Sequence, residues 1–269
     1  MSKLVIDIRE KPFAFQTLSS FSGLDIVSIR KRIESFSGRN EREISAFLES
    51  FSNIPSNIDD TDFIFTHITS SADNQCKSIR NHGLLNLTAA YRNTSTELRL
   101  FLDAHDIDIR IDYQCIKYKN HYYSIEYDSH DCPLEWETEA YNGWLVGKKF
   151  APDPGVCGFL VYDTSHPYLG GVHECPEILR DLDRLLGTAL AEEWKKTSHP
   201  YAITCRVPGP FIEINQSSQD IHEVMLRYLE NAIWVTIAGP TFEETVQCWQ
   251  HTIVRPEMII RIEPFKKWG

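Results

Sequence analysis

The sequence lacks the features that mark several large classes of protein. No apolar run approaches the roughly 20 residues that a membrane-spanning helix needs, and residues 1–10 contain no apolar stretch of the kind found in a secretory signal. The 7 cysteines include no Cys-x-x-Cys pair and no pattern of metal-ligand spacing. These absences predict a cytoplasmic protein with reduced thiols, without a membrane partner and without a metal site.

Positive charge is also scarce, with 27 Lys and Arg against 38 Asp and Glu and a net charge of −11. Broad nucleic-acid binding needs many Lys and Arg contacts to phosphate, so this balance disfavours it. The densest basic group is Arg30-Lys31-Arg32, which we expect on the solvent-facing side of a helix. With 269 residues, the chain is long enough for one large domain or for a domain of about 200 residues with an extension.

The first 58 residues predict helices and little chemistry. Ile26, Ile29 and Ile33 have helical spacing, and a second helical stripe begins after Asn40. Residues 3–9 alternate loosely and are compatible with an edge strand. We therefore expect an N-terminal helical extension over residues 1–58 and a main domain over residues 59–269.

The most informative stretch is residues 63–85. It begins with Phe63, Ile64 and Phe65, which favour a strand. Residues two apart in a strand point to the same side, so His67 and Thr69 are expected to share one face. A Ser or Asp in the following loop can cap a short helix, which a glycine then ends. The stretch predicts a His and a hydroxyl at the edge of a cleft, although an ordinary strand ending explains the same residues.

The remaining chain alternates between strand and helix patterns. A hairpin is expected around residues 107–127, and further strands are expected at 159–162 and 201–208. Residues 174–197 predict one long helix, a shorter one begins at 221, and residues 233–237 form a β-branched run. Two final strands are expected to join at Arg255-Pro256. Residues 128–156 read as an irregular segment that carries Trp136, Tyr141 and Trp144, either a binding loop or a packed surface loop.

The order of these segments resembles the ADP-ribosyltransferase superfamily, and most closely its poly(ADP-ribose) polymerase-like branch. In that branch a strand carries His-Gly-Thr or His-Gly-Ser, and a helix and Gly-Leu follow. Here the tripeptide is His67-Ile68-Thr69, with Ile68 in place of the glycine, and Gly83-Leu84 follows. The resemblance covers roughly residues 60–265. It implies an α+β ADP-ribosyltransferase-like fold, with two packed antiparallel sheets flanked by helices.

The same resemblance implies NAD as the substrate and assigns roles to individual residues. His67 and Thr69 would hold NAD, and His67 is also a candidate catalytic residue. Two tyrosines of the second family segment stack on the nicotinamide ring, and the candidates here are Tyr162 and Tyr168, although a strict overlay puts Leu160 at the first position. A strand Tyr is also a common core residue, which leaves both readings open.

The third family segment carries the catalytic glutamate, often within Asn-Glu-x-Ile-Val-Tyr. Aligning Ile253-Val254 with that Ile-Val puts His251 where the glutamate is expected, with Gln250 beside it and Glu257 beyond the turn. Transfer of ADP-ribose breaks a C–N glycosidic bond through an oxocarbenium-like state, for which a nearby polar or charged group provides stabilisation. Gln250, His251 and Glu257 are therefore the candidates for this third role.

These observations lead to three hypotheses. The first is an NAD-dependent ADP-ribosyltransferase that modifies an unknown macromolecular acceptor, and the resemblance extends this to a bacterial toxin or defence effector. The second is a catalytically inactive ADP-ribosyltransferase-like binding protein, which the misplaced glutamate favours. The third is an interaction protein without any link to NAD, for which convergence of His67, Tyr162 and Tyr168 in one pocket is the discriminating observation.

Overall fold

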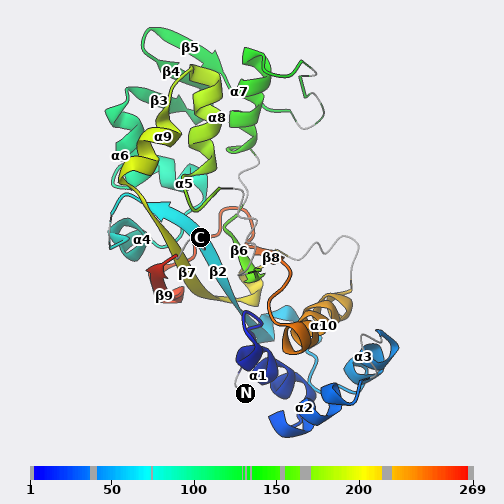
Figure 1. Ribbon diagram of the computed structural model, residues 1–269. Coiled ribbons are helices and arrows are strands. Elements are labelled where there is room, and N and C mark those ends of the chain that lie inside the picture. The colour runs from blue at the N-terminus through cyan, green and yellow to red at the C-terminus, as the bar shows by residue number, and fades with distance from the viewer. Residues whose placement is uncertain are drawn as a thin grey trace.

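The computed structural model describes residues 3–36, 41–73, 75–128, 130, 132–133, 135–151, 155–163, 171–213 and 220–265. Over these ranges the chain forms an α+β protein with two sheets (Figure 1). The α+β class and the presence of two sheets are thus confirmed. Within the same ranges, no helix combines the length and the apolar character required to cross a bilayer.

The main sheet has six strands, which the chain visits out of sequence order. They are β1 (Leu4–Ile6), β2 (Thr61–Ser71), β6 (Cys157–Val161), β7 (His199–Pro208), β8 (Glu244–Gln247) and β9 (Ile259–Pro264), and the path across the sheet is β8-β6-β2-β7-β9. The long central pair is β2 and β7, antiparallel from Asp62 opposite Pro208 to Ser71 opposite His199. All pairings are antiparallel except that of β1, which lies parallel to the start of β2.

Helices cover this sheet mainly at the N-terminal end of β2. They are α1 (Lys11–Ser22), α2 (Ile26–Glu34), α3 (Glu41–Leu48) and α10 (Ile221–Ala238). Together with the sheet they enclose the sheet core, a buried cluster that includes Phe63, Phe65 and Leu229. Figure 1 shows these four helices at one end of the molecule, with β2 and β7 running away from them.

The N-terminal segment contains helices, as expected, but residue 58 does not divide two cores. Ile6 and Ile8 are buried in the same cluster as Phe63, and α1 packs against α10. The start of α2 follows from its sequence, because the Asp25 side chain accepts a hydrogen bond from the Ser28 N–H at 2.9 Å. Residues 1–58 are therefore packed against the main domain and share its core.

The second sheet is a three-stranded meander far along β2 from the sheet core. Its strands are β3 (Ile107–Arg110), β4 (Cys115–Tyr118) and β5 (His121–Ser124), paired in that order, and they lie in the region where a hairpin was expected. Its buried isoleucines, Ile107, Ile109 and Ile116, belong to a separate hairpin core. The helices of that core are α5 (Leu87–Arg92), α6 (Glu97–Ala104), α7 (Glu139–Lys148), α8 (Glu177–Leu186) and α9 (Leu190–Thr197).

This arrangement corrects the expectation that the two sheets pack on each other. The apolar face of the small sheet is covered by helical residues such as Leu179 and Leu182, and the main sheet packs on α1 and α10. The helices α6 and α7 contact strands β3 and β5 directly, and α8 packs on α7 with its own buried stripe. Each sheet therefore has its own helical layer.

Three local predictions also need correction. The predicted helix over 174–197 is interrupted by Gly187, whose φ of 65° ends α8 before α9 begins. The β-branched run 233–237 lies in α10, because burial in the sheet core outweighs strand propensity there. Of the two C-terminal strands, β9 forms, whereas residues before it contribute only an isolated bridge at Val254.

Candidate functional site

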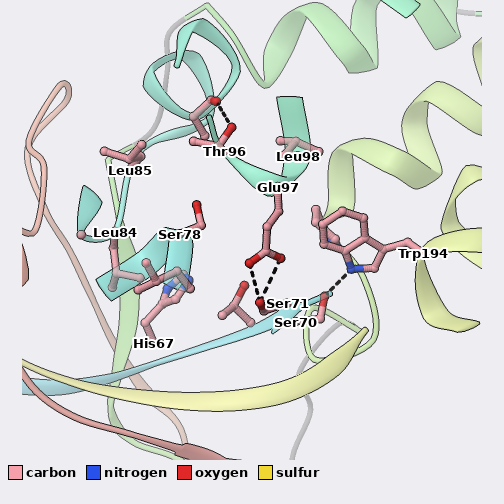
Figure 2. Close-up of a pocket in the computed structure, with 15 residues that line it drawn as sticks. His67, Ser70, Ser71, Ser78, Leu84, Leu85, Thr96, Glu97, Leu98 and Trp194 are labelled. Atoms are coloured by element: carbon pink, nitrogen blue, oxygen red, sulfur yellow. Dashed lines mark hydrogen bonds between the residues drawn. The ribbon is translucent and has the colours of Figure 1, made fainter. Parts of the chain in front are cut away.

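A pocket of about 140 Å³ opens beside the C-terminal half of β2 (Figure 2). Its walls come from β2, from α4 (Lys77–His82) with the turn that follows it, and from the first turn of α6. Trp194 of α9 closes one side. His67 and Thr69, the two residues of stretch 63–85 that are expected to hold NAD, both line this pocket.

Strand alternation explains why these residues meet. Phe63 and Phe65 point into the sheet core, and the next residues on the same face are His67, Thr69 and Ser71. The face is therefore apolar where α10 covers it and polar where the pocket opens. One face of β2 therefore contributes residues both to the sheet core and to the pocket.

The imidazole of His67 is held in a defined orientation. Its Nδ1 lies 2.7 Å from the carbonyl oxygen of Cys157 on the neighbouring strand β6. Because a carbonyl only accepts, Nδ1 carries the proton, and Nε2 of the neutral ring has a free lone pair. Burial lowers the pKa of His67, and the hydrogen bond to Cys157 opposes that shift only in part. His67 is therefore a neutral hydrogen-bond acceptor at neutral pH.

The same pocket contains a carboxylate that the sequence did not reveal. Glu97 accepts hydrogen bonds from the Ser71 hydroxyl at 2.7 and 2.9 Å and from the Ala72 N–H at 2.8 Å. Figure 2 shows its carboxylate directed toward β2, on the same side of the strand as His67. Thr96 fixes the start of α6 by accepting from the Arg99 N–H at 3.3 Å. From the sequence, Glu97 is indistinguishable from any acidic residue in a first helical turn.

A buried hydrogen bond connects the two cores at this point. The indole Nε1 of Trp194 donates to the Ser70 hydroxyl at 2.9 Å. Trp194 is a member of the hairpin core, whereas Ser70 belongs to the central strand of the main sheet. The pocket therefore lies where the two cores meet, and its walls are held by both.

The turn after α4 forms the opposite wall and requires glycine. Gly83 has a φ of 78°, and a Cβ at this position would lie 2.1 Å from the carbonyl oxygen of Val254. Leu84 and Val254 exchange two backbone hydrogen bonds, at 2.9 and 3.0 Å. Gly83 thus meets two requirements that exclude a side chain, a positive φ and a close backbone approach.

The other predicted catalytic residues lie elsewhere. Gln250, His251 and Glu257 are solvent-exposed and are not among the residues that line this pocket. His251 occupies a turn with a φ of 64°. Glu257 sits on the short 3-10 helix η4 (Pro256–Met258), and its Oε1 lies 3.6 Å from the Arg255 guanidinium. The structure therefore brings His67 and Thr69 together with Glu97 but not with these three residues.

Tyr162 is also distant from the pocket. It packs against Ile68 and Ala202, whose side chains lie on the opposite face of β2 and β7 from His67. Its ring meets that of Phe159 edge-on at 6.0 Å, and burial raises the pKa of its hydroxyl. Leu160 is fully buried in the sheet core. Tyr168 lies outside the described residues. His67 and Tyr162 therefore do not converge in one pocket, an outcome that favours the interaction-protein hypothesis.

Comparison with models of known protein families, with curated proteins and with solved structures gives no match. In the part of the chain that the structure describes, no group of three or more His, Cys, Asp or Glu side chains is placed to hold a metal ion. The groups available for chemistry in this pocket are therefore the neutral imidazole of His67, the Thr69 hydroxyl and the Glu97 carboxylate.

Proposed function

We propose that this pocket binds the nicotinamide end of NAD and that the protein is an NAD-dependent ADP-ribosyltransferase with an ADP-ribosyltransferase-like fold. The observation that carries the proposal is that His67 and Thr69 line one pocket together with the carboxylate of Glu97. The acceptor in this proposal is a macromolecule. A role as a toxin or defence effector belongs to the same proposal and rests on the sequence resemblance alone.

The size of the pocket favours partial insertion of the ligand. At about 140 Å³ it is smaller than the ~300–1,000 Å³ of a pocket that encloses a drug-sized molecule. The flat nicotinamide ring, a pyridinium with one carboxamide, suits such a volume and its mixed polar and apolar walls. The ribose and the pyrophosphate of NAD would then lie across the opening.

The three polar groups offer complementary chemistry. The free Nε2 of neutral His67 can accept a hydrogen bond from a ribose hydroxyl, and the Thr69 hydroxyl can donate a hydrogen bond to a carboxamide oxygen. Positive charge develops on the ribose as nicotinamide leaves, and the fixed negative charge of Glu97 is positioned by Ser71 and Ala72 before the reaction starts. A carboxylate that also acts as a general base contributes about 10²–10⁴ in rate.

A second candidate is a protein that binds NAD without turnover. It is favoured by the exposure of Gln250, His251 and Glu257, which leaves Glu97 as the acidic residue among those lining the pocket. The oxygens of Glu97 already accept hydrogen bonds from Ser71 and Ala72, so their capacity for a ligand is reduced. Release of nicotinamide distinguishes the two candidates.

The test combines NAD-binding calorimetry with measurement of released nicotinamide. The native chain is compared with Glu97→Gln, and Glu257→Gln is the matched control because Glu257 is exposed and outside the pocket. We expect release by the native chain, a loss of about 10²–10⁴ in turnover for Glu97→Gln, and no change for Glu257→Gln. Binding without release by the native chain would support the second candidate, and absence of binding would contradict both.

A further inference from the structure

A second surface with distinct chemistry lies on α7, in the segment that the sequence predicted to be irregular. Four aromatic rings follow one another there: Tyr127 and Trp144 lie 5.2 Å apart, Trp144 and Tyr141 6.4 Å apart, and Tyr141 and Trp136 5.3 Å apart between centroids. We call this row the α7 aromatic row. None of its residues lines the His67 pocket.

The row lies at the surface although its rings are largely apolar. Trp136 has 77% of its surface exposed, and Tyr127, Tyr141 and Trp144 are half-buried. Large aromatic side chains that gather on a surface mark binding sites more often than single exposed ones do. Trp144 is held in place because its Nε1 donates to the Asp128 carbonyl oxygen at 2.9 Å. This hydrogen bond fixes the orientation of Trp144 in the row, so that part of the surface is preorganised for binding.

A pocket of about 380 Å³ adjoins the row and is bordered by carboxylates. Its lining includes Tyr127 and Trp144 together with Glu126 and Asp128. Residues 126–149 contain 6 Asp and Glu but only 2 Lys. Neither Glu126 nor Asp128 forms an ion pair with the Lys and Arg residues that the structure describes.

One ring of the row already contacts a cation within the protein. The Lys148 ammonium lies 5.4 Å from the centroid of Trp144, in a cation–π contact. The negative potential of the ring faces and the excess of carboxylates both attract cations and repel phosphate. A planar guanidinium stacks on aromatic rings and donates to carboxylates at the same time, which an ammonium does less well.

We propose that the α7 aromatic row and its acidic pocket bind an arginine-containing basic segment of a partner protein. One arginine side chain enters the pocket beside Glu126 and Asp128, and neighbouring residues of the segment lie along Tyr141 and Trp136. This surface and its partner are independent of what the His67 pocket binds.

The test uses a fluorescently labelled Gly-Ser peptide that carries three arginines, with fluorescence anisotropy as the readout. The matched probe replaces each arginine by citrulline, which keeps the shape and removes the charge. We expect the arginine peptide to bind, its affinity to fall as salt rises from about 0.05 to about 0.5 M, and the citrulline peptide not to bind. Equal binding of the two peptides would overturn the proposal in favour of an uncharged ligand such as a sugar.

Two variants locate the contact. Trp136→Ala should weaken binding by about 2- to 5-fold, the equivalent of one exposed cation–π contact, whereas Tyr113→Ala removes a similarly exposed ring (81% exposed) from outside the row and should change nothing. Glu126→Gln should weaken binding and reduce its salt dependence, with the exposed Glu223→Gln as control. Native affinity in both Trp136→Ala and Glu126→Gln would place the peptide elsewhere and contradict the proposal.

Discussion

The two halves of β2 present the same face of one strand to very different surroundings. Phe63 and Phe65 are fully buried under α1 and α10, whereas His67 and Thr69 line an open pocket. The strand geometry is continuous through both halves, since β2 pairs with β7 along its whole length after Thr61. Alternation therefore decides which face a residue joins, and the covering helices decide whether that face becomes core or site.

The largest difference between the two halves of β2 is expected when a side chain is removed from each of them. Phe65→Ala should lower the free energy of unfolding by about 3–5 kcal/mol, because it leaves a cavity in the sheet core. Thr69→Ala should change it by only about 0.5 kcal/mol, because the side chain borders open space. Urea unfolding followed by circular dichroism measures both. Similar losses in the two variants would show that the pocket half is packed as tightly as the core half.

A smaller loss of stability is expected when a methyl group is added to the same core from the neighbouring strand β6. A Cβ added at Gly158 would lie 2.2 Å from Cδ2 of the Phe65 ring, so Gly158→Ala should destabilise by about 1–3 kcal/mol. The penalty should shrink when Phe65 is also replaced by Leu, which a double-mutant cycle in urea unfolding detects. If the two changes are additive, the contact between Gly158 and Phe65 does not limit the packing.

The contribution of the polar half of β2 to the free energy of unfolding should depend on pH. Because burial lowers the pKa of His67 below its usual 6.5, the unfolded chain binds its proton more readily than the folded chain does. The stability tied to neutral His67 is therefore complete above about pH 6.5 and is lost as pH falls through the lower folded pKa. The stability of His67→Asn should decrease less than that of the native chain between pH 7 and pH 5. Parallel pH profiles would contradict the assignment of a neutral imidazole whose pKa is lowered in the folded state.

The pH dependence of stability that His105 contributes is opposite in sign to that of His67, and it is the smallest of the effects expected. Burial alone would lower its pKa, but hydrogen bonds to the Phe101 carbonyl and to Glu193, the latter at 2.8 Å, together raise it above 6.5. Its contribution is complete below the unfolded pKa and is lost as pH rises through the folded pKa. His105→Gln should therefore remove stability at pH 6 and little at pH 9, in the same unfolding experiment. A loss that grows with pH would be inconsistent with the ion pair to Glu193.

Local sequence predicted the parts of the site that depend on local geometry. The period of two placed His67 and Thr69 on one face, and the turn at Gly83 ended α4 where expected. Glu97 was not identified, because only tertiary packing aims its carboxylate at Ser71. The same applies to Tyr162, whose position on the opposite face depends on how β6 pairs with β2.

The helix α7 was not predicted for a similar reason. Gly143 and Gly147 lower helix propensity and suggested a loop. In the fold they allow close approach, because a Cβ at these positions would lie 2.2 Å from the Ser124 carbonyl oxygen and 2.1 Å from that of Ile125. Residues that weaken a helix in isolation here permit its contact with the end of β5.

The most direct test of the proposed site is thermal unfolding with and without NAD, in the native chain and in His67→Ala. NAD at about 100 times its Kd stabilises the folded state by about 2.7 kcal/mol, which raises Tm by about 5 °C. We predict this rise in the native chain and in the exposed-site control Glu257→Gln, and its loss in His67→Ala. A native chain whose Tm does not change at millimolar NAD, or a His67→Ala variant that retains the full rise, would contradict the assignment of the pocket as the NAD site.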